Sequence, residues 1–412
     1  MSIYLNNAAT TWPKPRCVPE AAAEFLARGG GNLGRGTASW RDLATLNMVL
    51  DCRIRLAKLF DGCDDGNPRY VTFCSGVTEA LNVVFKGFRK SFFSSAPKTV
   101  MRVLSTSMEH NAVVRPLRGM EGEGVATEFL ECGPDGALDL GLLEEVLMDG
   151  KFHLMVLSHA SNVCGTIQPL EGIAGLCRGA GLPLVLDSAQ TAGILPISAS
   201  KLGLAALCFT GHKGLMGPQG IGGVVWDPGF ASRVAPLVEG GTGSFSHMET
   251  QPWEMPDKFE AGTPNLPGIA GLDAALGWLE ETEIEGIRER ESKIGEYFLE
   301  RLQKAGGVLY GKPTMEGRLA VFAVDFPLWP PSDRKNTKMW DNGILADELS
   351  KRGFETRPGL HCSPLAHKTL GSFPKGSLRV SPGYFNTPED IDAFFDAVEA
   401  VKECRDECTG KN

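Results

Sequence analysis

Lys213 is the residue of this chain whose type and position most strongly suggest covalent chemistry. It lies in the segment CFTGHKGLMGPQGIGG, where the apolar run from Ala205 to Phe209 gives way to a glycine-rich loop. A lysine held at the end of a buried strand loses basicity because desolvation disfavours the ammonium form, and the neutral amine can condense with an aldehyde. The alternative is a solvated surface lysine, so the surrounding segments have to decide between the two.

Asp187 follows a second apolar run, in PLVLDSAQTAG, which begins at Pro183. A carboxylate at the carboxyl end of a buried strand is unfavourable unless it meets a cation, and a protonated pyridine nitrogen is such a cation. Gln190, three residues further on, could then contact the phenolic oxygen of the same ring. Together with Lys213, this suggests that the aldehyde is that of pyridoxal 5'-phosphate (PLP). The alternative is that the Asp and Gln only cap a helix.

The segment TFCSGVTEALNVVFKGF suggests a phosphate site. A short apolar strand over residues 70–73 is followed by a Ser-Gly turn and then by apolar residues at helical spacing. The turn brings Gly76, Val77 and Thr78 to a helix N-terminus, where free backbone N–H groups and the helix dipole favour an anion. The alternative is an ordinary helix that a side-chain hydroxyl caps, with no ligand.

Taken together, these segments resemble the class-V aminotransferases of PLP-dependent fold type I, and within them the NifS-like cysteine desulfurases. The resemblance covers nearly the whole chain, from YLNNAATTWPKP near the N-terminus to RVSPGYFNTPEDID near the C-terminus. It implies that Lys213 binds the PLP aldehyde, that Asp187 contacts the pyridine nitrogen and that Gln190 contacts the phenolic oxygen. The residues that it implies around the cofactor phosphate are Gly76, Val77, Thr78, Thr210 and His212.

The same resemblance assigns roles around the ring and the substrate. His110, in SMEHNAVV, is similar to the histidine that stacks on the cofactor ring and can act as acid or base. Asn162, in HASNVCGT, is similar to an asparagine near the ring and the substrate. Arg379 is similar to the arginine that binds the substrate carboxylate, with Arg357 as a second substrate-binding residue. Thr263, in FEAGTPN, is similar to a threonine that reaches the phosphate of the neighbouring subunit, which implies a homodimer.

A nucleophilic cysteine distinguishes a desulfurase from its relatives, and Cys362 in RPGLHCSPLAH is the candidate. It lies in a loop punctuated by Gly and Pro, beside His361 and five residues after Arg357, so that local positive charge would favour a thiolate. The alternative is one more packed thiol among eleven cysteines. The loop differs from that of the best-known desulfurases of the second group, which have His-His-Cys where this chain has Leu360, His361 and Cys362.

The resemblance implies that L-cysteine is converted to L-alanine, with the sulfur transferred to Cys362 as a persulfide and then to a sulfur-acceptor protein. Three alternatives stay open. The first is a selenocysteine lyase, and the second is another PLP reaction, such as transamination, epimerisation or a different beta-elimination, with Cys362 incidental. The third is a binding or scaffold protein that keeps the fold without catalysis, although the joint presence of Lys213, Asp187, Arg379 and Cys362 argues against it.

Strands and helices must position these residues. Apolar runs over 100–104, 154–157, 184–186 and 207–209 are the expected strands, and helical patterns lie between them. Such alternation predicts an α/β fold with a mainly parallel central sheet and helices on both faces, and the site residues fall at strand ends, where such sheets bind ligands. Residues 272–298 form a long amphipathic helical region, and residues 319–326 a strand. We therefore expect a large PLP-binding domain over 15–265 and a smaller α+β C-terminal domain formed by 1–14 and 266–412.

Composition is compatible with a two-domain enzyme of 412 residues, 42% of them hydrophobic. The formal net charge of −9 argues against a nucleic-acid partner. No apolar stretch reaches the length of a membrane span and the N-terminus lacks the layout of a signal peptide, so a cytoplasmic location is expected. The odd number of irregularly spaced cysteines indicates reduced thiols. No metal is expected, because His153, His159, His247 and His367 lack metal-ligand spacing and are interpreted as structural or surface residues.

Overall fold

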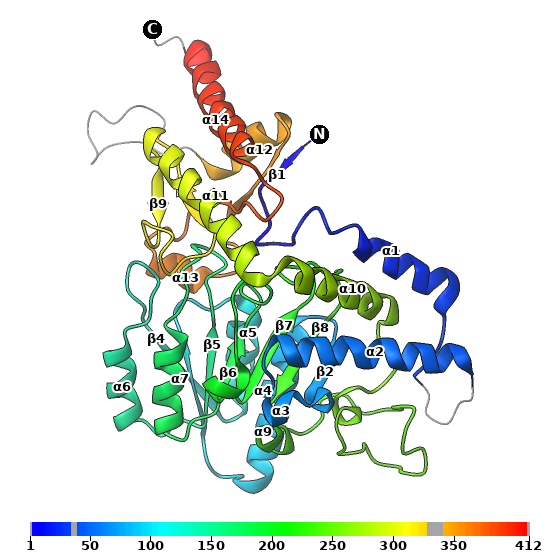
Figure 1. The fold of residues 1–412 in the computed structure, drawn as a ribbon. Helices are drawn as coiled ribbons and strands as arrows, with labels where there is room; N and C mark the ends of the chain where they lie inside the picture. Colours follow the sequence, from blue (N-terminus) through cyan, green and yellow to red (C-terminus); the bar gives the residue numbers. More distant parts are fainter. Residues whose placement is uncertain (1, 34–38, 328–340, 410–412) are drawn as a thin grey trace.

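The large sheet has seven strands in the order β2-β8-β7-β6-β5-β3-β4 (Figure 1). The computed structural model describes residues 2–33, 39–327 and 341–409. Neighbouring strands from β7 to β4 are parallel, whereas β8 runs antiparallel to both of its neighbours. The predicted mainly parallel sheet is therefore confirmed. Its strands are β2 (Val71–Cys74), β3 (Met101–Thr106), β4 (Val125–Leu130), β5 (Leu154–Ser158), β6 (Leu184–Asp187), β7 (Ala206–Thr210) and β8 (Gly222–Trp226).

Both faces of this sheet are covered, because side chains that alternate along each strand enter two separate hydrophobic cores. In β5, Met155 and Leu157 belong to the first core, while Leu154 and Val156 belong to the second. Burial on both faces explains why these strands read as continuous apolar runs. The first core takes side chains from α1 (Cys17–Glu24), α2 (Trp40–Leu59), α6 (Leu140–Asp149), α7 (Leu170–Gly179), α8 (Ala199–Leu202) and α10 (Leu266–Thr282), and the second from α4 (Val77–Ser95), α5 (Asn111–Met120) and α9 (Pro228–Ser232).

A smaller group of elements lies at one end of the large sheet, in the upper part of Figure 1. A four-stranded antiparallel sheet in the order β12-β13-β10-β9 forms its centre, and β1 pairs in parallel with β11 beside it. Its core contains Phe298, Phe322 and Phe394, and the rings of the first two stack with centroids 4.4 Å apart. The elements are β1 (Ile3–Tyr4), α11 (Ile284–Lys304), β9 (Val308–Tyr310), β10 (Phe322–Asp325), α12 (Asn342–Lys351), β11 (Phe354–Glu355), β12 (Arg357–Gly359), α13 (Pro364–Thr369), β13 (Ser377–Val380) and α14 (Pro388–Thr409).

The helical region predicted over 272–298 is divided into two helices, α10 and α11. The chain turns between them at Glu283, which has a φ of 63°. A single left-handed residue does not interrupt the apolar spacing on either side, so the sequence pattern contains no sign of the turn. The strand predicted over 319–326 is the shorter β10. Because α10 contributes Ile269, Leu272 and Leu276 to the first core of the large sheet, the domain limits at 265 and 266 stay a prediction. No helix in the described ranges is long and apolar enough to cross a membrane.

His159 is a buried structural residue directly after β5, with 5% of its surface exposed. Its Nδ1 lies 3.0 Å from the hydroxyl of Thr191, and burial lowers the pKa of the ring to about 4. A histidine whose native pKa lies below its unfolded value costs stability as the pH falls, because the unfolded chain binds the proton first.

We expect His159→Asn to reduce the loss of unfolding free energy between pH 7.5 and pH 5.5 by about 1.3 kcal/mol, since one proton-binding group is removed from the unfolded state. Urea unfolding of the wild type and the variant at both pH values measures this difference. His247→Asn, at an exposed position, is the matched control. An unchanged pH dependence in the His159 variant would contradict the prediction.

Candidate active site

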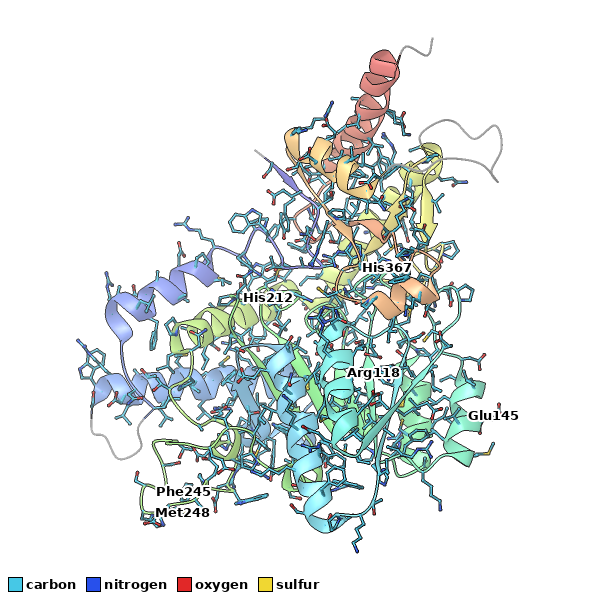
Figure 2. The ribbon with its side chains drawn as sticks, turned by 180° about the vertical axis from the view of Figure 1, so that it is seen from behind. Arg118, Glu145, His212, Phe245, Met248 and His367 are labelled. Atoms are coloured by element: carbon cyan, nitrogen blue, oxygen red, sulfur yellow. The ribbon has the colours of Figure 1, made fainter. Side chains whose placement is uncertain are left out.

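Most of the site residues predicted from the sequence line one cavity of about 200 Å³. The cavity lies where the carboxyl ends of β5, β6 and β7 meet β12 and β13 of the small sheet, in the region of His212 in Figure 2. The convergence predicted from the strand ends is therefore present. The predicted residues that line it are Val77, Thr78, His110, Asn162, Asp187, Gln190, Thr210, His212, Lys213, Arg357 and Arg379.

Lys213 lies in the turn after β7, and the N-terminal segment holds this turn. Thr11 Oγ1 donates a hydrogen bond to the Lys213 carbonyl at 3.0 Å. The His212 carbonyl accepts one from Thr10 Oγ1 at 3.0 Å and one from Lys14 Nζ at 2.7 Å. Burial lowers the pKa of Lys213 to about 8, although the charge of Asp187 acts in the opposite direction. A fraction of the amine is therefore neutral near pH 7, as condensation with an aldehyde requires.

Asp187 ends β6 at the floor of the cavity and is 4% exposed. Its Oδ1 accepts a hydrogen bond from the Ala189 amide at 2.9 Å, and burial raises its pKa. A second carboxyl, Glu109, is fully buried behind it and accepts a hydrogen bond from Ser158 Oγ at 2.6 Å. Burial raises the pKa of Glu109 to about 7, and the charge of Asp187 adds to this rise. Glu109 directly precedes His110, but no sequence pattern marks it as a site residue.

The predicted phosphate site is formed by the start of α4 and the end of β7. Gly76 precedes the helix, and no side chain caps its first backbone N–H groups. An added Cβ at Gly76 would approach Thr210 Oγ1 to 3.4 Å, so the two segments are close together. The buried Nδ1 of His212 has no hydrogen-bond partner within the described residues, and burial lowers the pKa of this ring to about 4. A phosphate would satisfy both the helix N-terminus and this nitrogen.

Arg379 places a buried guanidinium at the cavity, with 1% of its surface exposed. Its Nη1 donates to the Asn162 carbonyl at 3.0 Å, and its Nη2 donates to Asn6 Oδ1 at 2.8 Å. Both acceptors are amide oxygens and carry no charge. The buried Nε has no partner among the described residues. Burial, followed by the charge of Arg357, lowers the pKa of Arg379 to about 9. A buried cation with neutral partners favours an anionic ligand such as a carboxylate.

His110 caps the N-terminus of α5 through its ring. Its Nδ1 accepts a hydrogen bond from the Ala112 amide at 3.0 Å, so that a proton on the neutral ring is carried by Nε2. Burial and the charge of Lys213 lower the pKa of this histidine to about 4. His110 is therefore neutral at physiological pH and can donate one proton from Nε2.

Cys362 is the one exposed thiol among the cysteines whose side chains the structure describes. His361 and Cys362 have φ values of 50° and 60°, a backbone conformation that is uncommon and strained for residues with side chains. The Cys362 carbonyl accepts a hydrogen bond from the Asn111 amide at 2.8 Å, and Arg357 Nη2 lies 3.7 Å from its Sγ. The thiol thus lies beside the cavity, where it shares a groove with Thr78 and His110.

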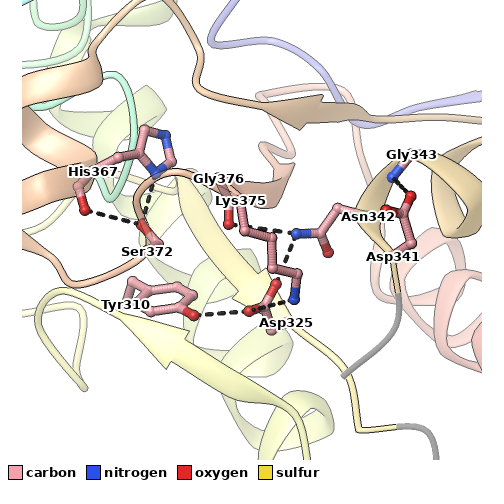
Figure 3. A network of polar contacts seen from close by, with 9 residues as sticks. All are labelled: Tyr310, Asp325, Asp341, Asn342, Gly343, His367, Ser372, Lys375 and Gly376. Carbon is pink, nitrogen blue, oxygen red and sulfur yellow. Dashed lines mark hydrogen bonds and ion pairs between the residues drawn. The ribbon is translucent and has the colours of Figure 1, made fainter. Parts of the chain in front are cut away.

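A chain of hydrogen bonds stabilises the turn that contains His361 and Cys362. His361 Nε2 donates to the Arg357 carbonyl at 2.9 Å, so its Nδ1 accepts from His367 Nε2 at 3.1 Å. His367 Nδ1 in turn accepts from Ser372 Oγ at 2.7 Å, as Figure 3 shows. Burial lowers the pKa of His361 to about 2 and that of His367 to about 4, so both rings stay neutral. His367 is thus a buried structural residue, as predicted, and its contact with His361 is not visible in the sequence.

The turn is anchored on two further sides. Asn162 Nδ2 donates to the His361 carbonyl at 2.7 Å, and Asn162 Oδ1 accepts from Ser363 Oγ at 2.7 Å. Near Ser372, the loop before β13 is fixed because Lys375 Nζ lies 3.1 Å from Asp325 Oδ2 (Figure 3). Asn162 therefore links Arg379 at the cavity to the turn that carries Cys362.

Of the predicted residues, Gly76, Cys362 and Thr263 do not line this cavity. Gly76 directly precedes α4 and Cys362 lies in the adjoining groove, whereas Thr263 lies elsewhere. It lines a separate cavity of about 810 Å³ together with Leu46 and Leu50 of α2. This placement leaves the predicted contact with a neighbouring subunit untested. Within the described ranges, no group of three or more His, Cys, Asp or Glu side chains is placed to hold a metal ion.

The residues of the cavity fit PLP. Lys213 supplies an amine of lowered pKa, and Asp187 supplies a buried carboxylate that a pyridinium would neutralise. Gln190, whose Nε2 donates to the Ala8 carbonyl at 3.0 Å, lies in the same cavity. The unpartnered Nδ1 of His212 and the uncapped start of α4 match a phosphate.

The chain is similar to proteins named cysteine desulfurase over nearly its whole length. A "Probable cysteine desulfurase" of Halalkalibacterium halodurans is 29% identical over 404 residues, which are 97% of this chain and 93% of that protein. A "Probable cysteine desulfurase" of Xylella fastidiosa is 30% identical over 408 residues, 97% of this chain and 91% of that protein. Among solved structures, the apo cysteine desulfurase of Thermococcus onnurineus has a TM-score of 0.85 at 26% identity, covering 98% of this chain and 95% of that chain. The S-sulfonic acid form of the Escherichia coli cysteine desulfurase CsdA has a TM-score of 0.80 at 26% identity, with the same coverage.

The family model for class-V aminotransferases matches residues 3–394, nearly the whole chain. Its match includes every strand of both sheets and every residue assigned to the cavity. The chain therefore belongs to the class-V aminotransferase family, whose members are PLP-dependent enzymes.

Proposed function

We propose that this protein is a cysteine desulfurase, which converts L-cysteine to L-alanine and transfers the sulfur to Cys362 as a persulfide. The observation that carries the proposal is the exposed Cys362 thiol, which a strained turn holds beside the cavity of Lys213 and Arg379. Full-length similarity to proteins named cysteine desulfurase supports it.

Several residues bind and orient the reactants. When bound, PLP supplies an electron sink conjugated to the α-carbon of the substrate. With PLP bound, Asp187 would stabilise the protonated pyridine nitrogen, and Gln190 would be the partner of the phenolic oxygen. Arg379, with Arg357 beside it, binds the substrate carboxylate through charge-assisted hydrogen bonds. The backbone at Gly76 and Val77 and the side chains of Thr78, Thr210 and His212 would hold the phosphate of PLP.

Lys213 and His110 move the protons. Lys213 Nζ, with its pKa lowered to about 8, removes the proton from the α-carbon as a general base. His110 is neutral and faces the same cavity, so its Nε2 can exchange a proton with the substrate.

The sulfur step needs no outside oxidant. The Cys362 thiolate attacks the substrate sulfur and forms an S–S bond, while the bond between that sulfur and the β-carbon breaks. The electron pair of the broken bond passes to the carbon, which takes up the proton that the substrate thiol gives up. The β-carbon is thus reduced as the substrate sulfur is oxidised. The products are alanine and a persulfide on Cys362. An acceptor thiol must then remove the outer sulfur of this persulfide.

The test is turnover of L-cysteine by the purified protein with PLP and a reductant. We expect alanine and sulfide in equal amounts. An oxo acid, a D-amino acid or another product without sulfide would indicate a different class-V reaction, and no turnover of any amino acid would indicate a binding protein. A parallel arm with L-selenocysteine separates a selenocysteine lyase, which would turn over that substrate far faster than L-cysteine.

We propose in addition that the protein acts as a homodimer and that Thr263 reaches the phosphate of the partner subunit. One face of α2 carries large apolar side chains that are 44–69% exposed, and Thr263 lies beside it. An exposed apolar stripe of this extent is typical of an interaction surface. Its residues are Trp40, Leu43, Leu46, Leu50 and Ile54.

We expect Leu46→Glu to shift the protein from dimer to monomer, because it places a charge in the middle of this stripe. Sedimentation velocity at micromolar concentration measures the change. Leu142→Glu, at an exposed apolar position on α6, is the matched control and should leave the mass unchanged. A monomeric wild type would contradict the dimer proposal, including the role of Thr263.

We also propose that the protein acts in the cytoplasm. The cysteines whose side chains are described are all free thiols, which supports a reducing compartment.

A further inference from the structure

A groove leads away from Cys362 between α4 and α5, outside the cavity of Lys213, and has a volume of about 500 Å³. One side of each helix forms its walls. Residues four positions apart lie on the same face of a helix, so each wall is a straight row that starts near the helix N-terminus. The two rows are Thr78, Asn82 and Lys86 on α4, and Asn111, Arg115 and Gly119 on α5.

The groove has the size of a small molecule. Each row spans eight residues of helix, which is about 12 Å, and an extended tripeptide measures about 10 Å. The volume also lies within the usual range for small-molecule sites. At the far end, a Cβ added to Gly119 would meet no atom within 4 Å, so the groove is open there.

The charge of the groove is positive. Lys86 and Arg115 are exposed and have no ion pair among the described residues. The acid that lines the groove, Glu123, is instead paired with Arg89 at 2.8 Å. The charge of Arg115 extends to His110, whose pKa it helps to lower. Cations that line a concave site raise the local concentration and the association rate of anions.

We propose that this groove is a binding site for a low-molecular-weight anionic thiol, which removes the sulfur from Cys362. The inference rests on the proposed desulfurase function. The thiolate of the bound molecule attacks the outer sulfur of the Cys362 persulfide and forms a new S–S bond. The bond to Cys362 Sγ breaks, and its electron pair stays on Cys362 as a thiolate. The outer sulfur keeps its oxidation state, so the transfer needs no further reactant.

The test isolates this second half of the reaction. One equivalent of L-cysteine first loads the PLP-bound enzyme, and alanine formation with a mass increase of one sulfur atom on Cys362 verifies loading. The loaded enzyme is then mixed at low ionic strength with 3-mercaptopropionate, 2-mercaptoethanol or cysteamine, which are anionic, neutral and cationic. The quantity measured is the ratio of the discharge rates with the anionic and the neutral thiol. Comparing this ratio between variants cancels the intrinsic reactivity of each thiol.

We expect Lys86→Glu to lower this ratio at least about tenfold, and to raise the ratio for cysteamine, because the two cations of the groove become one cation and one anion and the net positive charge is lost. High salt should remove most of the difference. Lys201→Glu is the control with the same change in net charge, since α8 belongs to the core on the opposite face of the sheet. It should keep the wild-type ratio.

Equal ratios in the Lys86 and Lys201 variants would overturn the inference. A protein acceptor would then be the remaining candidate. Failure of the first step, with no alanine and no added sulfur, would instead overturn the desulfurase function and the thiol site with it.

Gly119→Gln gives a steric test, because it places a larger side chain at the open far end of the groove. It should slow discharge by glutathione, a tripeptide that would reach this end, more than discharge by the smaller 3-mercaptopropionate.

Discussion

Replacing Lys213 by alanine is expected to lower turnover of L-cysteine at least about 10³-fold, because the residue is both the covalent anchor of PLP and the general base. In the wild type, borohydride should fix the cofactor on the Lys213 peptide, and the variant should show no such modified peptide. Absorbance of the bound cofactor, peptide mass and alanine formation measure these effects.

Lys14→Ala is the matched control. Lys14 is also a lysine whose pKa burial lowers to about 8, and it holds the Lys213 turn from the N-terminal side. Its replacement should weaken the turn but leave the modified peptide at Lys213. Borohydride modification of a different lysine, or a colourless wild type supplied with PLP, would contradict the assignment of Lys213.

Cys362→Ala is expected to separate cofactor binding from sulfur transfer. Cofactor absorbance should be unchanged, because Cys362 lines the groove and not the cavity of Lys213. Alanine formation from L-cysteine should fall at least about 10²-fold, since the nucleophile that receives the sulfur is removed. L-Selenocysteine should retain a larger share of its rate, because selenium leaves carbon more readily than sulfur.

The control for this variant is Cys17→Ala, which removes a half-buried free thiol of α1. It should keep the wild-type rate and the added sulfur atom on Cys362. Full activity of Cys362→Ala on L-cysteine would remove Cys362 from the mechanism and favour another class-V reaction.

The sequence predicts the central sheet and much of the site because these features depend on local signals. A strand buried on both faces reads as a continuous apolar run, and a polar residue at its end marks the carboxyl edge. Such signals predict Asp187 and Lys213 at strand ends, and in the structure Asp187 ends β6 and Lys213 lies in the turn after β7. The helix start after Gly76 is a local signal of the same kind.

The parts that could not be predicted depend on contacts between segments or on single backbone angles. Glu109 accepts a hydrogen bond from Ser158, which lies 49 positions away, and nothing near Glu109 in the sequence indicates this partner. His361 and His367 meet because the chain turns through two left-handed residues into the six-residue helix α13. Their separation of six residues does not match the helical period, and the segment between them is a turn and a short helix and not a strand, so no sequence pattern reveals the pair.

The contacts of the N-terminal segment affect how the site is completed during synthesis. Asn6 bonds to Arg379, 373 positions later, and the Ala8 amide bonds to Ser381 Oγ, again 373 positions later. The ribosome delivers the first residues of this arrangement long before their partners. Contacts so distant in sequence form slowly, because a very long loop has to close. A nascent chain that ends before residue 379 cannot bring Lys213 and Arg379 together, so the cavity that contains both residues forms only after residue 379 has been synthesised.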